Sequence, residues 1–501
     1  MNSDKYKLSP NALVQYLDKP AQEFTKLDLI TFVEHNHIEL INYHYVADDG
    51  RLKTLNFVIN SREHLNNMLS SGERVDGSSL FTHMEAGSSD LYVIPRYRTA
   101  FINPFNEIPT LDLLCTFFTK EGKPLESSPE YILKKAHKVL IDNTGYHFEV
   151  MGELEYYVIS EKDDLFMATD QKGYHESAPF NKMAEFRTEA MRLIAQCGGR
   201  IKYGHSEVGN FVQNGKNYEQ NEIEFIPSPI EEAADQLIIA KWILRRLAYD
   251  YDIDLTFAPK ITVGKAGSGL HIHTRLIKDG KNAMVEKGAL TDTARKAIAG
   301  YLKLAPSLTA FGNTNPTSYF RLVPHQEAPT SICWGDRNRS TLVRVPLGWS
   351  GSADMAHIAN PLEKENKRDF SFKQTAEFRC PDGSADIYLL LAGLTVAARH
   401  GLMEKDSLKF AKKTYVDINI FDDENHEKAN SLDVLPTSCV QSAKELDRQR
   451  QVYLEYDVFT ADLVDEIILK LDAYKDENLR KEVEKKEKKM LQLVERYFYC
   501  G

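Results

Sequence analysis

Two glutamates one residue apart constrain this chain more than any other feature. Glu153 and Glu155 lie in the run Gly-Glu-Leu-Glu-Tyr-Tyr-Val-Ile over residues 152–159, which is typical of a β-strand. Side chains alternate along a strand, so both carboxylates point to one face while Leu154 points to the other. The apolar continuation indicates a buried strand, although a half-exposed strand with two surface glutamates is the alternative. Neighbouring buried carboxylates repel unless a cation lies between them, so the run predicts a cation-binding face.

The bulk composition excludes several classes of partner. The chain has 501 residues, of which 42% are hydrophobic and 27% charged, as in ordinary soluble proteins with one large and one smaller domain. A net charge of −11 argues against binding to nucleic acids or to anionic membranes. The sequence shows neither an apolar run near the ~20 residues that span a bilayer nor a secretory signal at its start. The six cysteines are scattered, which favours a reducing compartment, the cytoplasm.

The region after a short polar N-terminal arm predicts a small sheet-rich domain, approximately residues 28–115. Strand-like runs at 38–46 and 52–59 flank an Asp-Gly turn at 49–50, which is a strong signal for a β-hairpin. A helix is expected over residues 62–70.

Helices and strands alternate over residues 130–400, which predicts an α/β or α+β catalytic domain. Ser128, as a cap residue before Pro129, predicts the start of one helix, and the pair Ser228-Pro229 predicts the start of a second. The second helix is expected between strands at 221–227 and 254–263. From about residue 460 the chain is highly charged, which predicts solvated helices without a chemical role.

A second acidic pair repeats the strand spacing. His205 and Glu207 precede an Asn-Gly turn at 214–215, and Glu222 and Glu224 follow it. The pattern predicts a hairpin that brings Glu207 close to Glu222.

Histidines, arginines and a third acid complete the pattern. His271 and His273 follow a Gly-Ser-Gly turn and share one face of a predicted strand, as a metal-binding arm or as a buried histidine pair. Glu377 and Arg379 share a face in the same way, where an exposed ion pair is the alternative. Four arginines cluster between apolar neighbours, and buried guanidinium groups need anionic partners. They are Arg321, Arg337, Arg339 and Arg344.

Together these residues predict the chemistry of phosphoryl transfer. Carboxylate-rich ligation favours Mg²⁺ or Mn²⁺ over zinc. Two such ions beside an arginine cluster are the usual apparatus for transfer of a phosphoryl group from ATP. The sequence contains neither a phosphate-binding Gly-x-x-x-x-Gly-Lys-Ser/Thr loop nor a kinase catalytic loop.

The motifs, in their order along the chain, resemble glutamine synthetases of the bacterial class I type over residues 28–440. The matching segments are Asp76-Gly77-Ser78-Ser79, Glu153-Leu154-Glu155, His205-Ser206-Glu207-Val208, Asn221-Glu222-Ile223, residues 267–273, Arg321-Leu322-Val323-Pro324, Glu327-Ala328-Pro329, Arg337-Asn338-Arg339-Ser340 and residues 377–382. The resemblance implies an α+β fold: an arm at 1–24, a small β-grasp domain at 25–118, and a large α/β catalytic domain at 119–501. The catalytic domain would carry an antiparallel active-site sheet and a charged C-terminal helix.

The resemblance also implies an activity, which is the ATP-dependent ligation of ammonia to the γ-carboxylate of L-glutamate through γ-glutamyl phosphate. The expected protein is a cytoplasmic homo-oligomer, a dodecamer of two hexameric rings, that binds Mg²⁺ or Mn²⁺, ATP, L-glutamate and ammonium. Neighbouring subunits would share each site.

The roles that the resemblance implies fall into four groups. One metal ion would be held by Glu155, Glu207 and Glu222, and the other by Glu153, His271 and Glu377. Glutamate would be held by Arg321, Arg379 and the backbone of Gly267. The nucleotide would contact Arg339, Arg344 and His273. From the next subunit, Asp76, as the base, and Ser79 would complete an ammonium site with Tyr174 and Glu207, and Glu327 would lie on a flap that closes over the intermediate.

Three alternatives stay open, and two departures from the family pattern support one of them, the catalytically silent homologue. Ala266 stands where the family often has Asn, and Thr375 where it often has Arg. One alternative is a γ-glutamyl ligase that uses an amine or polyamine. Another is a catalytically silent homologue that acts as a scaffold or nitrogen sensor, and a third is a metal hydrolase built on His271 and His273.

Overall fold

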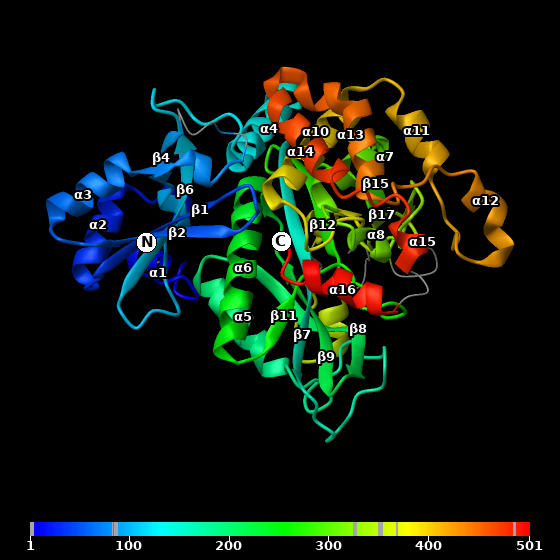
Figure 1. Ribbon diagram of the computed structural model, residues 1–501, viewed down its shortest axis with the longest axis horizontal. Helices are drawn as coiled ribbons and strands as arrows, with labels where there is room; N and C mark the ends of the chain where they lie inside the picture. Colours follow the sequence, from blue (N-terminus) through cyan, green and yellow to red (C-terminus); the bar gives the residue numbers. More distant parts are fainter. Residues whose placement is uncertain are drawn as a thin grey trace.

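The computed structural model describes residues 5–501 apart from 83, 85–88, 324–327, 349–353, 367–368 and 484–486. The chain forms two sheets of six and ten strands and a two-stranded ribbon within this described part. The smaller sheet belongs to the N-terminal part of the chain, at one end of the molecule (Figure 1).

The smaller sheet has the order β2-β1-β6-β4-β3, with β5 beside β6. Its β1 and β2 form the predicted antiparallel hairpin, while β1 and β6 run parallel. Three helices pack against the sheet around one apolar core, and α3 confirms the helix expected over 62–70. The elements are α1 (Ala12–Leu17), α2 (Lys26–His35), β1 (Leu40–Val46), β2 (Leu52–Val58), α3 (Arg62–Ser71), β3 (Glu73–Asp76), β4 (Asp90–Pro95), β5 (Phe101–Ile102) and β6 (Thr110–Phe118).

The larger sheet has the order β16-β17-β18-β12-β7-β9-β8, with β10 and β11 beside β7 and β13 beside β12. Its pairs are antiparallel except for β16 and β17. The strands are β7 (His147–Glu161), β8 (Ile201–Gln213), β9 (Lys216–Phe225), β10 (Ser228–Pro229), β11 (Asp254–Thr256), β12 (Leu270–Lys278), β13 (Lys281–Asn282), β16 (Trp334–Asp336), β17 (Val343–Val345) and β18 (Ala376–Phe378); β14 (Val285–Glu286) and β15 (Ala289–Leu290) pair separately.

The helices of the main apolar core cover one face of the larger sheet, and the site lies on the other face. Leu154 is fully buried in the main apolar core, and a Cβ atom at Gly152 would lie 2.8 Å from Leu237 of α6. The core includes α4 (Pro129–Thr144), α6 (Ile230–Asp250), α7 (Asp292–Gly312), α10 (Ile387–Met403) and α13 (Cys439–Leu454). The other helices are α5 (Ala184–Gln196), α8 (Ser318–Arg321), α9 (Met355–Ala359), α11 (Ser407–Thr414), α12 (His426–Asn430), α14 (Ala461–Asp472), α15 (Leu479–Val483) and α16 (Glu487–Tyr497).

Three local predictions need correction. The strand expected over 254–263 ends at Thr256, because the chain then turns into a loop in which the Pro259 carbonyl accepts a hydrogen bond from Ser268 at 3.0 Å. Ser128 makes no side-chain cap for α4, since its hydroxyl donates to the Glu130 carboxylate instead. The C-terminal helix α16 is not a purely solvated face, because its Met490 and Val494 are buried.

The two sheets are joined across α6. Arg96 and Arg98, from the chain beyond β4, contact the carboxylate of Asp235 in α6 at 2.9 and 2.8 Å. Burial alone would raise the pKa of Asp235, but the two guanidinium groups hold it below its ordinary value. Among the described residues, no helix combines the length and the apolarity that crossing a membrane requires.

Candidate active site

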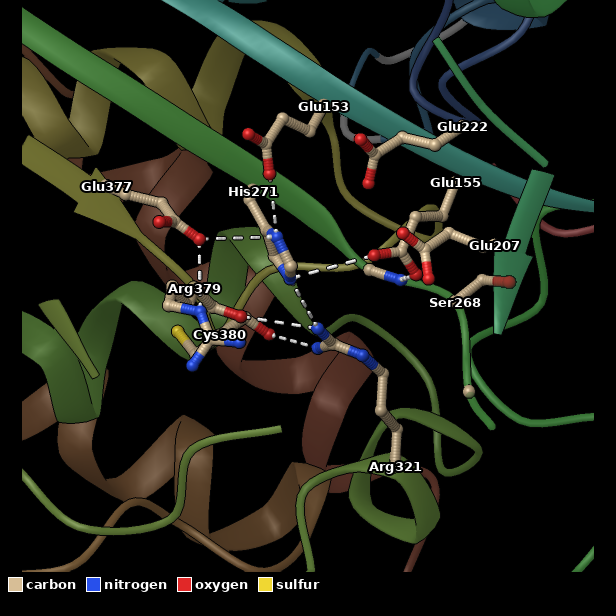
Figure 2. A network of polar contacts seen from close by, with 12 residues as sticks. Glu153, Glu155, Glu207, Glu222, Ser268, His271, Arg321, Glu377, Arg379 and Cys380 are labelled. Atoms are coloured by element: carbon tan, nitrogen blue, oxygen red, sulfur yellow. Dashed lines mark hydrogen bonds and ion pairs between the residues drawn. The ribbon is translucent and has the colours of Figure 1, made fainter. Parts of the chain in front are cut away.

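Strand register brings three predicted ligands together on the open face. Glu153 of β7 lies opposite His271 of β12, and His273 of β12 lies opposite Glu377 of β18. The Nδ1 atom of His271 lies 3.0 Å from Glu153 Oε2 and 3.5 Å from Glu377 Oε1 (Figure 2). His271 therefore stands between two carboxylates that come from two other strands.

The second acidic set comes from β7, β9 and β8. Glu155 lies opposite Glu222, and Glu222 lies opposite His205, in the antiparallel register that the predicted hairpin requires. The His205 Nε2 atom is 3.2 Å from Glu222 Oε1, and His205 Nδ1 is 3.8 Å from Glu207 Oε1. Glu207 sits in a stretch of β8 where the register shifts. The hairpin thus brings Glu207 close to Glu222, as predicted, and His205 contacts both.

The two acidic sets differ in electrostatics. Burial would raise the pKa of Glu153, but the adjacent His273 and His271 lower it well below its ordinary value. Burial raises the pKa of Glu222 well above its ordinary value, and the charges of Glu153, Glu155 and Glu207 add to the shift. Crowded carboxylates of this kind favour a bound cation.

Guanidinium groups line the opposite side. The side chains of Arg344 and Arg379 contact the two oxygens of Glu377 at 3.1 and 3.0 Å. Arg321, from α8, donates to the Cys380 carbonyl at 2.8 Å and lies 3.3 Å from His271 Nε2 (Figure 2). Arg379 also donates to the backbone carbonyl of Arg339. Glu377 is therefore the anionic partner of Arg344, one member of the predicted cluster, and of Arg379.

The glycine-rich turn forms a further wall. The Gly267 carbonyl accepts a hydrogen bond from Gln220 at 2.9 Å, and a Cβ atom at Gly267 would lie 2.5 Å from the Pro259 carbonyl. The departures from the family pattern also have partners here. Ala266 donates its N–H to Gln171 at 2.7 Å, and the Thr375 hydroxyl lies 2.8 Å from His273 Nδ1.

One cavity of about 850 Å³ is lined by most of the predicted site residues. These are Glu153, Glu155, Tyr174, Glu207, Glu222, Gly267, His271, His273, Arg321, Arg339, Arg344, Glu377 and Arg379. Asp76 and Ser79 do not line it; both are exposed on the N-terminal domain, where the Ser79 and Ser89 hydroxyls donate to Asp76 and lower its pKa. Glu327 lies outside the described residues.

The structure adds two residues and gives a third, His273, a further contact. His205 and Glu224 also line the cavity, and both lie close enough to Glu222 to share a metal ion with it. The sequence signal for both was the two-residue period of a strand, which places Glu224 on the face of Glu222 and His205 on the face of Glu207. His273, assigned to the nucleotide, lies 2.7 Å from Glu153 through Nε2 and forms a similar candidate metal group with Glu153 and Glu377.

Comparison with known proteins agrees with this geometry. Residues 37–120 match the family described as "Glutamine synthetase, beta-Grasp domain", and residues 126–491 match "Glutamine synthetase, catalytic domain". A glutamine synthetase from Clostridium saccharobutylicum is 30% identical over 430 residues, which cover 84% of this chain and 88% of that protein. One from Pyrococcus horikoshii is 29% identical over 417 residues, covering 83% and 85%.

Solved structures show the same fold. A cryo-EM structure of Plasmodium falciparum glutamine synthetase has a TM-score of 0.72 at 20% identity and covers 90% of this chain and 97% of its own. A structure described as apo GmaS without ligand has a TM-score of 0.71 at 19% identity and covers 91% and 99%. The β-grasp domain, the catalytic domain and the acid-lined cavity lead to one conclusion: the chain belongs to the glutamine synthetase family.

Proposed function

We propose that this protein is an ATP-dependent glutamate–ammonia ligase that forms L-glutamine, ADP and phosphate. The observation that carries the proposal is the cavity in which carboxylates from three neighbouring strands face a cluster of arginines. A carboxylate is a poor acyl donor because its leaving group would be oxide. Phosphorylation to γ-glutamyl phosphate gives a stable leaving group, and this transfer requires concentrated positive charge.

The donor set fits Mg²⁺ or Mn²⁺, since hard oxygen ligands predominate. We assign Glu155, Glu207 and Glu222 to one ion, and Glu153, His271 and Glu377 to the other. When bound, the ions would neutralise the charge that develops on the transferred phosphoryl group. His273 contacts Glu153 and thereby holds this ligand in place.

The basic wall binds the two anionic substrates in this proposal. Arg321, Arg379 and the backbone of Gly267 hold L-glutamate, while Arg339 and Arg344 hold the phosphates of ATP. His273 faces the nucleotide. Support comes from the burial of Arg321 and Arg379, which are 4% and 6% exposed, because forks fixed in this way present defined donors to carboxylate and phosphate oxygens.

A second subunit completes the proposed site. Asp76 and Ser79 are exposed and lie outside the cavity of their own chain, so they are free to reach the cavity of a neighbour. There they join Tyr174 and Glu207 around ammonium, and Asp76 takes the proton that ammonium must lose before attack. This arrangement requires a homo-oligomer, and a dodecamer of two rings is the expected form. Glu327 closes the site against water.

The direct test is glutamine formation by the purified protein with ATP, L-glutamate, ammonium and Mg²⁺ or Mn²⁺. We expect equal amounts of glutamine, ADP and phosphate, and no product without the divalent cation. Glu327→Ala should abolish this turnover and leave ATP binding intact, as measured by calorimetry. A protein that binds ATP and glutamate without forming any amide would overturn the proposal in favour of a silent homologue.

One observation favours a second candidate, a γ-glutamyl ligase for amines. The rings of Tyr174 and His205 lie 5.4 Å apart, and those of Tyr203 and His205 5.8 Å apart, beside Glu207 and Glu222 in the cavity. Aromatic faces next to carboxylates suit an organic ammonium group. Phosphate release with ammonium, methylamine, ethanolamine and putrescine separates the two functions, because a markedly faster rate with an amine would replace ammonia as the acceptor.

A further inference from the structure

The loop between β11 and β12, residues 257–269, has two sides with different neighbours. Its residues 264–267 line the active-site cavity. On the other side, Ala258 and Ile261 are buried in a separate apolar cluster. This cluster also contains Met490 and Val494 of α16, which are 3% and 6% exposed. The C-terminal helix therefore packs directly behind a wall of the site, and Figure 1 shows it beside the lower strands of the larger sheet.

Hydrogen bonds from side chains fasten the segment that follows α16. The Tyr499 hydroxyl donates to Asp254 of β11 at 3.1 Å, and Thr256 donates to the Phe498 carbonyl. Arg51 of the N-terminal domain donates to the Tyr499 carbonyl at 2.8 Å, and Arg245 of α6 donates to the Cys500 carbonyl at 3.0 Å. Three separate parts of the protein thus hold this segment against the strand from which the loop begins.

Tyr157 connects the two sides of the loop. Its ring is fully buried in the cluster that contains Met490 and Val494. Its hydroxyl donates to the Ala266 carbonyl at 2.9 Å, one residue before Gly267. Tyr157 therefore links the packing behind the loop to the backbone that lines the cavity.

We propose that residues 487–501 form a C-terminal brace that fixes the conformation of residues 257–269, with Met490 and Val494 as positioning residues. The loop needs such support because Gly264, with φ +78°, and Gly267 allow its backbone many conformations. If only a fraction of molecules holds the loop in the binding conformation, the apparent affinity for the ligand falls by that fraction. The expected ligand is the L-glutamate of the proposed function, on which this part of the inference rests.

The test compares the double variant Met490→Ala/Val494→Ala with Leu491→Ala in the full-length protein. Leu491 lies on the same helix but is 37% exposed, so it controls for a general effect of shortening α16 side chains. Hydrogen exchange of the 257–269 peptide reports the loop, and exchange of α10 (387–403), in the main core, reports the overall fold. Initial rates report KM for L-glutamate and kcat separately.

We expect faster exchange in 257–269 for the double variant, with α10 unchanged, and a KM for L-glutamate raised about tenfold at nearly constant kcat. Leu491→Ala should match the wild type. Met490→Leu/Val494→Ile, which keeps large apolar side chains at both positions, should restore the wild-type loop exchange and KM. Unchanged loop exchange in the double variant, or an equal change with Leu491→Ala, would overturn the brace.

If the wild type forms no glutamine, the proposed function fails, whereas the exchange comparison still decides the brace. If α10 exchange also rises, Tyr157→Phe, which removes the hydroxyl that donates to Ala266, must reproduce the loop effect.

Discussion

Buried carboxylates have different neighbours at the two ends of the cavity. At the arginine end, which we define as Glu153, Glu377, His271, His273, Arg344 and Arg379, imidazole or guanidinium groups contact each acid. At the acidic end, defined as Glu155, Glu207, Glu222 and His205, burial and the neighbouring carboxylates raise the pKa of Glu222. Burial lowers the pKa of His205, so this imidazole compensates little of the charge.

The difference indicates separate energetic roles. A buried carboxylate with two guanidinium partners contributes to the fold through its pairs, and removing it leaves charges without partners. A group of repelling carboxylates contributes nothing to the fold until a cation binds. The arginine end should therefore matter for stability in any buffer, and the acidic end only when a divalent cation is present.

Replacing Glu377 by Ala should have the largest effect. Glu377 is 1% exposed, and its loss leaves Arg344 and Arg379 without their shared anion. We expect a loss of about 3–5 kcal/mol in the free energy of unfolding, which is typical for breaking a buried pair, together with loss of activity. Urea unfolding followed by circular dichroism measures it. Glu161→Ala is the control, because this residue of β7 is 82% exposed and should change stability by less than about 0.5 kcal/mol. Equal effects of the two variants would contradict the comparison.

Replacing Glu222 by Gln should separate stability from cation binding. Without divalent cations, the free energy of unfolding should not fall, because Gln removes a repelling charge and keeps the shape. In the wild type, Mn²⁺ at about 100 times its Kd should add about 2.7 kcal/mol, and the variant should lose most of this gain. Thermal unfolding with EDTA and with Mn²⁺ measures both quantities, with Glu161→Gln as the control. A variant that Mn²⁺ stabilises as fully as the wild type would show that the acidic end is not a cation site.

The sequence predicted which side chains share a face of the larger sheet better than it predicted the order of the strands in that sheet. Alternation along strands placed Glu153 with Glu155, Glu222 with Glu224, and His271 with His273, and the structure keeps each pair on the open face. The turn at 214–215 also predicted which two strands form the hairpin. These features depend on local geometry, which a single sequence contains.

Long-range features could not be predicted in this way. The position of β12 between β7 and β18, which sets Glu153 opposite His271 and His273 opposite Glu377, depends on pairing between segments far apart in the chain. Arg321 reaches the cavity from the short helix α8 rather than from a strand. The buried face of α16 had a signal, because Met490 and Val494 are four residues apart, but the surrounding charges obscured it. The roles of all the site residues, Asp76, Ser79 and Glu327 among them, and the division near residue 118 stay predictions.

Lys241, a buried basic residue outside the cavity, makes the stability of the fold depend on pH. Lys241 of α6 donates to the Gly383 carbonyl, and burial lowers its pKa from 10.5 to about 7. The unfolded chain therefore binds more protons between these values, so stability should rise with pH in this window and fall toward pH 7. Between pH 7 and 9, we expect the wild type to gain about 1 kcal/mol per pH unit relative to Lys241→Met. Urea unfolding across this range measures the slopes. Lys138→Met, at a site that is 73% exposed, should keep the wild-type slope, and parallel curves for Lys241→Met would disprove the explanation.

Glu224 gives the test with the smallest expected effect, because it lies between the arginine end and the acidic end of the cavity. It lies opposite Glu153 in the strand register and shares a face with Glu222. Lys202 contacts its carboxylate at 2.6 Å, and the Tyr203 hydroxyl donates to it. If its two donors compensate it, Tyr203→Phe should cost only about 0.5–1 kcal/mol of unfolding free energy, because Lys202 remains. The double variant with Lys202→Met should cost more than the sum of the single changes, since Glu224 then lacks both donors. Additive effects in this double-mutant cycle would place Glu224 with the uncompensated acids instead.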